Sequence, residues 1–304
     1  MSESDEEFNE ESLWETELEI ALLSNCDYGT IRNISKLRPL PDNLRNKVWK
    51  VCLDVEKDIE INQISKWKEI YDLPQQDKIR EDCQHLAQKL HPDDEEQQLI
   101  ATSAAEAIVT FFCISNDEFY EKDNGWLEIL FPILSLNLNK NEAYNFFSAI
   151  IRRYIPKDCV QNGSPYHLFR LLMLYHDPEL CAFLDTKKIS PDSYAHIWFR
   201  SLFAANSNLK VILNLWDMYF QLGDQFLIFF MSLILVFNLR DEIMASTDME
   251  KAELAKMILS SPLSLNEDDL NDFNTLCQHF ATKTPQSFRK IFQKIVKEFN
   301  VVEI

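Results

Sequence analysis

The chain has 304 residues, of which 46% are apolar, enough material for one large domain or for two lobes. Its formal net charge of -19 disfavours non-specific binding to nucleic acid or to an anionic membrane. Only four glycines are present, so the sequence contains no Walker loop, no GxGxxG dinucleotide-binding turn and no GxSxG nucleophile elbow.

The cysteines indicate a reducing compartment, and the spacing of the histidines argues against a metal site. Seven cysteines are scattered without a CxxC pair, which is typical of free thiols in a reducing cytosol. The six histidines form no i, i+4 pair and no HExxH, so we predict no metal site and no cofactor. A signal peptide begins with a basic segment that is followed by an apolar one. The N-terminus of this chain is acidic, so no signal peptide is predicted. We therefore expect a soluble cytoplasmic protein.

The N-terminal region is strongly acidic. Nine acidic residues lie between Glu3 and Glu19, and the first basic residue is Arg32. We interpret residues 1–24 as a solvated acidic tail that leads into an amphipathic helix beginning near Leu13. The alternative is a tail that contacts a partner.

Helical periodicity continues through the rest of the chain. Further helices are predicted over residues 41–55, 74–90, 92–114, 207–223 and 264–280. The run Phe226 to Phe237 is apolar on all faces, but its twelve residues are too few for a membrane span, which needs about 20. We interpret this run as a buried core helix. Because no stretch alternates convincingly with period two, the predicted fold class is all-α.

Two ordered sets of residues carry a family resemblance. In the first, Arg38 to Trp49, an arginine at position 45 precedes Trp49 by four residues. The second, residues 177–239, contains Trp198 and the Trp216-Asp217 pair ahead of the apolar run. This order and spacing resembles the TBC domain, the fold of GTPase-activating proteins for Rab GTPases.

The resemblance covers roughly residues 37–244 and implies a two-lobed helical domain. We expect the N-terminal lobe over residues 25–120. The C-terminal lobe, with trailing helices, is expected over residues 121–304. The residues that match the structural motifs of the family are Arg45, Trp49, Ile79, Asp82, Trp198, Trp216 and Asp217.

The first catalytic motif of the family is altered here. Active members carry an arginine finger in an Ile-x-x-Asp-x-x-Arg motif; Ile79 and Asp82 match it, but His85 stands at the arginine position. An arginine finger raises the rate by about 10³ to 10⁵, because its permanent charge stabilises the phosphoryl group in transfer. Histidine, with an ordinary pKa near 6.5, is mostly neutral at cytosolic pH. Arg80 is no substitute, because five residues rotate it by about 140° around the helix.

The second catalytic motif is altered as well. In the family it reads Tyr-x-Gln-Gly-Met, and the glutamine positions the attacking water. Here Gly125 matches, but Asn124 stands at the glutamine position and Lys122 at the tyrosine position. Asparagine is one methylene shorter, and a displacement of about 1 Å can cost around a hundredfold in rate. The resemblance therefore implies a TBC domain with no catalytic residue at either finger position.

Three segments narrow the resemblance to a catalytically degenerate, golgin-binding branch of the family: residues 168–172, 183–189 and 283–290. That branch implies an adaptor, peripheral at the trans-Golgi network, that helps to capture endosome-derived vesicles through a golgin tether and without direct membrane insertion. The alternatives are a Rab GTPase activator with atypical fingers and a Rab-binding effector without activity. In that branch a rhodanese-like and a C-terminal module follow; fourteen residues follow Lys290 here, so we expect both modules to be missing from this sequence.

A basic segment on this acidic chain is the candidate partner-binding surface. Residues 32–50 hold six basic side chains against one acid, Asp42. We call this segment the basic strip. It can steer an acidic partner segment by electrostatic attraction; the alternative is that these are ordinary solvated side chains. The candidate partner-binding residues are Arg32, Lys36, Arg38, Lys47 and Lys50.

Overall fold

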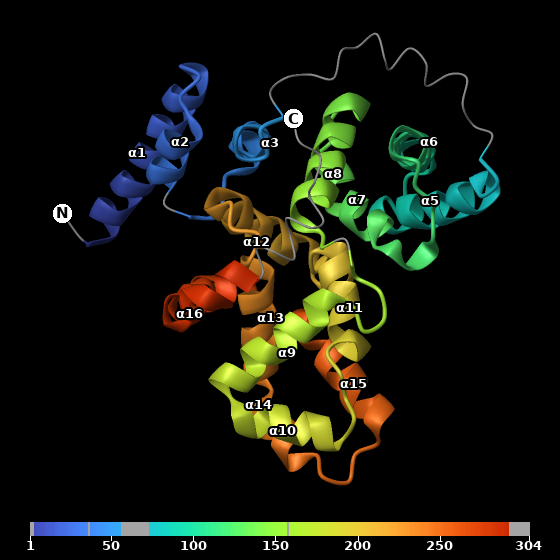
Figure 1. Ribbon diagram of the computed structural model, residues 1–304. Coiled ribbons are helices and arrows are strands. Elements are labelled where there is room, and N and C mark those ends of the chain that lie inside the picture. Colours follow the sequence, from blue (N-terminus) through green and yellow to red (C-terminus); the bar gives the residue numbers. More distant parts are fainter. Residues whose placement is uncertain (1–2, 36, 56–72, 157, 292–304) are drawn as a thin grey trace.

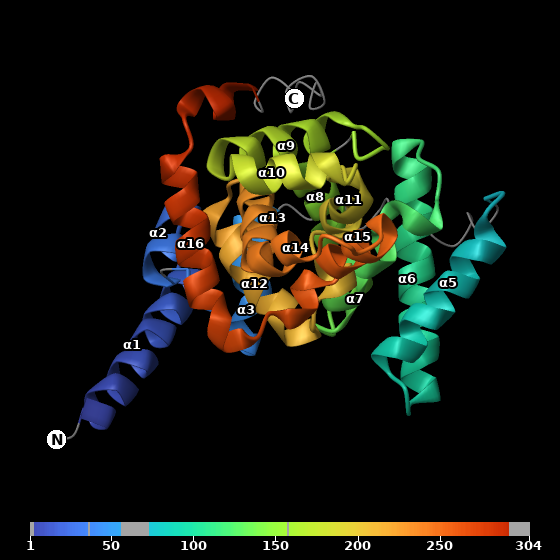
Figure 2. The same ribbon diagram turned by 90° about the horizontal axis from the view of Figure 1, so that it is seen from below.

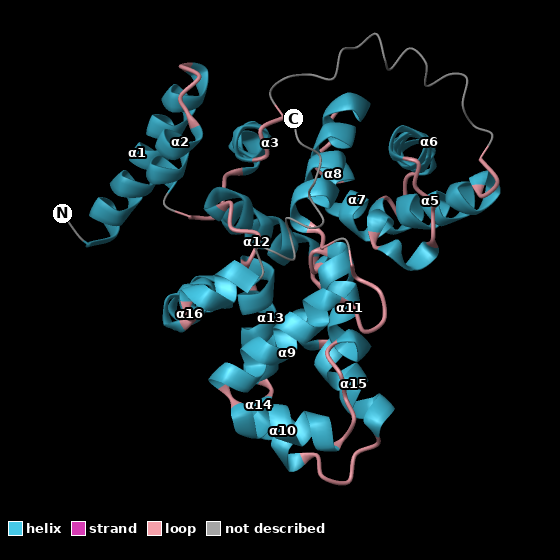
Figure 3. Cartoon of the chain, in the orientation of Figure 1, coloured by secondary structure: helices cyan, strands magenta, loops and turns pink. Residues whose placement is uncertain are grey.

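The structure is a computed structural model that describes residues 3–35, 37–55, 73–156 and 158–291 (Figure 1). Every regular element in these ranges is a helix, which confirms the predicted all-α class (Figure 3). The first half of the chain forms α1 (Glu3–Leu23), α2 (Tyr28–Ser35), α3 (Asp42–Cys52), α5 (Gln76–Leu90), α6 (Glu95–Asn116), η2 (Lys122–Asn124), α7 (Trp126–Leu134) and α8 (Lys140–Tyr154).

The second half forms a larger set of helices. They are α9 (Ser164–His176), α10 (Pro178–Thr186), α11 (Asp192–Ser201), η3 (Ala204–Asn206), α12 (Leu209–Leu222), α13 (Leu227–Asn238), α14 (Arg240–Ala245), α15 (Lys251–Leu259), η4 (Ser261–Ser264), η5 (Glu267–Asp269) and α16 (Leu270–Lys283). In Figure 1 most of the first half lies above most of the second, and α12 runs between them. Helix α7 packs against α5, α6 and α8 but also against α11 and α12, so it joins the two groups.

Local capping signals predicted several helix boundaries correctly. Helices α3, α5, α6 and α12 begin within three residues of their predicted starts. Asn208 caps α12 by accepting a hydrogen bond from the backbone N–H of Lys210 at 3.0 Å. Gly223 ends the same helix with a φ of 61°.

Two predicted boundaries were wrong. Helix α1 begins at Glu3, so the acidic run predicted as a solvated tail is the first part of a helix. Glutamate is a good helix former, and negative charge is favourable near a helix N-terminus. The helix predicted from residue 264 begins at Leu270 instead. Asn266 and Asp269 form a capping box around the short turn η5, which leads directly into α16.

The most apolar helices differ in how they are buried. Helix α13 is buried along nearly its whole length, as the apolar run predicted. Helix α6 is long and apolar enough to cross a membrane by length and composition alone. Half of its apolar window is nevertheless buried inside the protein, where α6 packs against α5, α7 and α8. This packing is that of a core helix.

A buried polar cluster joins α3 to α12, and we call it the Arg45–Asp217 tie. The Asp217 carboxylate accepts hydrogen bonds from Trp49 Nε1 at 2.8 Å, from Arg45 Nε at 3.1 Å and from the backbone N–H of Leu40 at 2.9 Å. Asp217 and Trp49 are fully buried. Burial raises the pKa of Asp217 to about 6, and the positive charge of Arg45 opposes that rise. The family motif residues of the two halves thus meet in one cluster.

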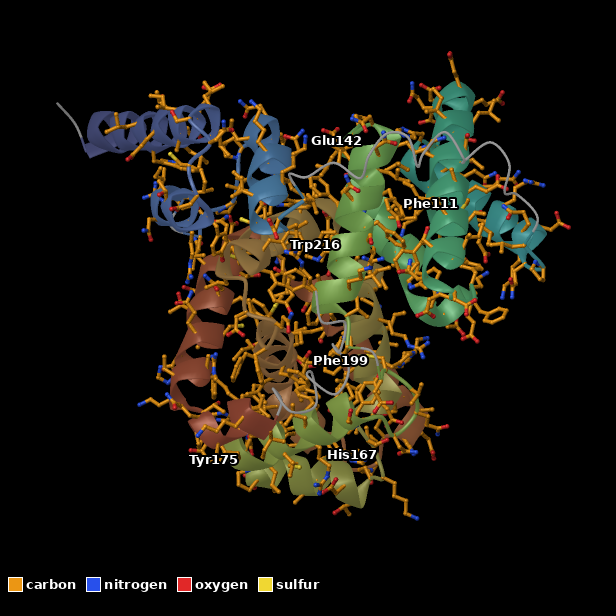
Figure 4. The ribbon with its side chains drawn as sticks, turned by 45° about the horizontal axis from the view of Figure 1, so that its top comes forward. Phe111, Glu142, His167, Tyr175, Phe199 and Trp216 are labelled. Atoms are coloured by element: carbon orange, nitrogen blue, oxygen red, sulfur yellow. The ribbon has the colours of Figure 1, made fainter. Side chains whose placement is uncertain are left out.

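Two further motif tryptophans also have buried backbone partners. Trp216 Nε1 donates to the carbonyl of Leu202, and Trp198 Nε1 donates to the carbonyl of Leu259, both at 3.0 Å. Trp216 lies in the centre of the molecule (Figure 4). These bonds satisfy the indole N–H groups and fix the rings within the core.

Candidate functional site

The finger positions lie beside an open groove between α5, α7 and η3. We call it the finger groove, and its volume is about 210 Å³. It is lined by Asp82, His85, Leu86, Lys89, Lys122, Leu127, Glu128, Phe131, Ala204 and Ala205. His85 is therefore a wall residue, while Asn124 lies just outside the lining.

Asp82 organises one wall of the finger groove. Its carboxylate accepts a hydrogen bond from the Tyr120 hydroxyl at 3.0 Å and pairs with Lys122 Nζ at 3.3 Å. Burial and the neighbouring Asp82 raise the pKa of Tyr120, so its hydroxyl remains a donor. Lys122, which stands at the tyrosine position of the second motif, and Tyr120, which lies outside that motif, therefore both contact Asp82.

His85 is an exposed side chain on α5. It lies one turn from Asp82 and one turn from Lys89, and both of these side chains also line the groove. An imidazole here has access to a ligand in the groove. It lacks the permanent charge and the forked geometry of the guanidinium that the family motif places at this position.

Asn124 is turned back onto its own chain. Its Oδ1 accepts a hydrogen bond from the backbone N–H of Trp126 at 3.2 Å, at the start of α7. Its Nδ2 is buried and has no hydrogen-bond partner among the described residues. The side chain is therefore bonded to the first residue of α7 and does not line the groove.

Gly125 fixes the backbone that carries Asn124. Its φ is +80°, a conformation that side chains rarely adopt, and a Cβ here would lie 2.4 Å from the carbonyl oxygen of Arg200. The loop can therefore approach α11 this closely only with glycine at this position.

The arginines near the groove are engaged with other groups. Arg200 donates from Nη1 to the carbonyl of Asp123 at 2.7 Å, and from Nε and Nη2 to the carbonyl of Cys159 at 2.9 and 2.7 Å. It therefore clamps two loops together. Arg80 pairs with Glu106 at 3.0 Å, as expected for a residue on another face of α5. No arginine is found among the described residues that line the finger groove.

The charges inside the groove are mixed. Lys89 and Lys122 face Asp82 and Glu128, and Lys89 Nζ lies 4.8 Å from the centre of the Phe131 ring. Burial raises the pKa of Glu128, and Lys89 opposes that rise. Because carboxylates offset the lysines, the groove does not concentrate the positive charge that a transferring phosphoryl group requires.

The basic strip is divided among several contacts. Lys50 pairs with Glu142 of α8, which lies beside α3 (Figure 4). The guanidinium of Arg38 lies 5.3 Å from the centre of the Trp14 ring. Lys47 is exposed and Arg32 is half-buried, while Lys36 lies outside the described residues. A partner-binding role for the strip stays a prediction, with Lys47 as its most accessible described member.

Comparison with known proteins identifies the family. The model of the RabGAP-TBC family, the Rab-GTPase-TBC domain, matches residues 42–244, about two thirds of the chain. The chain therefore belongs to the Rab-GTPase-TBC domain family. The matched range agrees with the resemblance drawn over residues 37–244.

Two solved structures share the fold. The Ypt/Rab-GAP domain of Gyp1p aligns with a TM-score of 0.66 at 12% identity, covering 85% of this chain and 94% of that one. The Chlamydomonas flagellar RabGAP TBC domain aligns with a TM-score of 0.66 at 15% identity, covering 88% of this chain and 90% of that one. At these identities the likeness shows the fold alone.

Curated relatives match over shorter stretches. The TBC domain-containing protein kinase-like protein of Homo sapiens is 31% identical over 121 residues, which is 38% of this chain and 13% of that protein. TBC1 domain family member 1 of Bos taurus is 30% identical over 105 residues, which is 33% of this chain and 9% of that protein. The matched part of this chain thus spans a small fraction of either relative.

Proposed function

We propose that this chain is a non-catalytic TBC-domain adaptor and not a Rab GTPase activator. The observation that supports this most directly is the finger groove. Its arginine position holds an exposed histidine, His85, and no arginine lines it among the described residues. At the second finger position, the side-chain oxygen of Asn124 accepts a hydrogen bond from the backbone N–H of Trp126.

The size of the expected loss follows from charge. A finger arginine contributes about 10³ to 10⁵ in rate by neutralising charge on the phosphoryl group in transfer. An imidazole has fewer hydrogen-bond donors than a guanidinium and carries no permanent charge. The groove holds two carboxylates, Asp82 and Glu128, beside its two lysines, so these side chains together offer a phosphate no net positive charge. Docking onto a GTPase remains feasible, because the folded framework around the groove is retained.

The proposed partner is a golgin tether, engaged in the capture of endosome-derived vesicles at the trans-Golgi network. This part of the proposal rests on the resemblance to TBC domain family member twenty-three, a catalytically degenerate, golgin-binding TBC protein. The resemblance is carried by residues 168–172, 183–189 and 283–290. The chain would act in the cytoplasm, peripheral to the membrane.

The basic strip gives this proposal a test. Replacing the exposed Lys47 with glutamate is expected to weaken binding of a golgin N-terminal segment in a calorimetric titration, because the charge that steers an acidic segment is reversed. The matched control is Lys256→Glu, a charge reversal of another exposed lysine on α15. Equal affinity of both variants and the wild type would remove the strip from the interface.

A second candidate function is recognition of a Rab GTPase, and membership of the Rab-GTPase-TBC family favours it. Two measurements on a Rab panel separate the candidates. Binding that depends on GTP but leaves hydrolysis unchanged would indicate an effector. Accelerated hydrolysis would indicate an activator with atypical fingers, and neither effect is expected for a golgin adaptor.

A further inference from the structure

Helix α1 has two faces of different character. Leu18 and Ala21 are buried, and Trp14 is partly buried, where α1 packs on α2 and α3. These three residues, spaced i, i+4 and i+7, form the inner face of the helix. Figure 2 shows α1 extending away from the rest of the molecule, with its far end standing clear of the other helices.

The opposite face carries large apolar side chains in solvent. Leu13 is 68% exposed, Ile20 is 59% exposed and Leu23 is 74% exposed. Residues seven apart on a helix point within about 20° of each other, so Leu13 and Ile20 form one line, and Leu23 lies next to it. We call these three residues the outer stripe. Their spacing of i, i+7 and i+10 places Leu13 and Ile20 at position a and Leu23 at position d of a heptad repeat, with Thr16 at the intervening position d.

The charges beside the outer stripe are all negative. With Leu13 at position a, Glu17 takes position e and Glu19 takes position g, so the two carboxylates flank the stripe on either side. Both side chains are exposed. Helix α1 contains no lysine or arginine, so no positive side chain of this helix neutralises Glu17 and Glu19.

We propose that the outer stripe is a docking surface for an amphipathic helix of another protein, with apolar residues at its own a and d positions and lysine or arginine at e and g. Charge complementarity selects this occupant. A second copy of this chain would bring Glu17 and Glu19 against the same charges, and an anionic membrane would repel them. The surface is distinct from the finger groove and from the basic strip, so the inference goes beyond the proposed function.

The test uses the full 304-residue chain and two synthetic peptides of about four heptads, with leucine at a and d. One peptide carries lysine at e and g, and the other carries glutamate. Fluorescence anisotropy is expected to show binding of the lysine peptide alone. The variant L13S/I20S should bind that peptide at least about tenfold more weakly, since each substitution removes an apolar contact from the interface.

A matched control distinguishes binding to the outer stripe from non-specific hydrophobic binding. The variant L99S/I100S removes two exposed apolar residues from α6, with similar exposures of 73% and 56%, and should bind the lysine peptide as the wild type does. Equal binding of L13S/I20S and wild type would overturn the proposal. So would comparable binding of the glutamate peptide, binding of anionic vesicles through the stripe, or self-association that L13S/I20S abolishes. None of these results depends on golgin binding or on Rab turnover.

Discussion

Asp217→Ala is expected to destabilise the domain more than any exposed ion-pair substitution. The change removes the acceptor that Arg45, Trp49 and the Leu40 amide share, and it leaves the buried Arg45 guanidinium with only the exposed carboxylate of Asp42 as a counterion. Breaking a buried pair by removing one partner costs about 3 to 5 kcal/mol. That loss is a large part of the roughly 5 to 15 kcal/mol by which domains are stable.

The loss converts into a measurable shift of the melting temperature. Unfolding entropy is about 2.1 cal/mol/K per residue, or about 0.64 kcal/mol/K for 304 residues. A loss of about 4 kcal/mol therefore lowers the Tm by about 6 °C. Thermal unfolding followed by circular dichroism at the helix band measures this directly.

The control for this prediction is Asp185→Ala. Asp185 pairs with Arg170 at the surface, where the two side chains are 42% and 38% exposed. Exposed pairs contribute about 0 to 1 kcal/mol, so this variant should shift the Tm by less than about 2 °C. The double variant Arg45→Ala/Asp217→Ala should lose less than the sum of its single variants, because the two groups interact. Equal melting of Asp217→Ala and Asp185→Ala would refute the reasoning.

Two further predictions concern the finger loop and an acid-sensitive histidine. Gly125→Ala should cost about 2 to 4 kcal/mol in denaturant unfolding, because of its positive φ and its approach to Arg200. The control Gly29→Ala, inside α2 and with its nearest contact at 3.4 Å, should not destabilise the chain, because alanine is favoured over glycine in a helix by up to about 1 kcal/mol. Burial lowers the pKa of His176, so the unfolded state binds a proton more readily and stability should fall as the pH drops below about 6.5. That fall should be smaller in His176→Gln than in the wild type, and an identical pH profile in the two proteins would contradict the assignment.

Local sequence signals predicted helix boundaries, but they did not predict the contacts that form the candidate site. Asn208 and Gly223 act on their own backbone neighbours, so their effect can be read from adjacent residues. The start of α1 was mispredicted because a run of acids is compatible both with a solvated tail and with a helix.

Contacts between distant residues were beyond a single sequence. The placement of Arg45 and Trp49 on one helix face was predictable, but their shared acceptor, Asp217, lies 168 and more residues away. The same holds for Arg200, which clamps Asp123 across 77 residues, and for Glu142, which pairs with Lys50 across 92 residues. Such pairings depend on how helices pack, which periodicity does not encode.

The finger motifs were located by spacing, and their altered residues follow from the sequence alone. The structure adds the contacts around them: Tyr120 donates a hydrogen bond to Asp82, and Asn124 accepts one from the backbone N–H of Trp126. Neither contact could be assigned beforehand, because each depends on how the segment between α6 and α7 packs against these two helices and α5.

The most direct test of the account is single-turnover hydrolysis of GTP by a panel of Rab GTPases, with the wild-type chain in excess. An arginine finger would accelerate hydrolysis by about 10³ to 10⁵. We predict that the chain changes the rate of GTP hydrolysis by every Rab in the panel by less than about tenfold, because no fixed cation reaches the phosphate to lower the activation free energy. Acceleration of any Rab by about a thousandfold, lost in His85→Ala, would contradict the account.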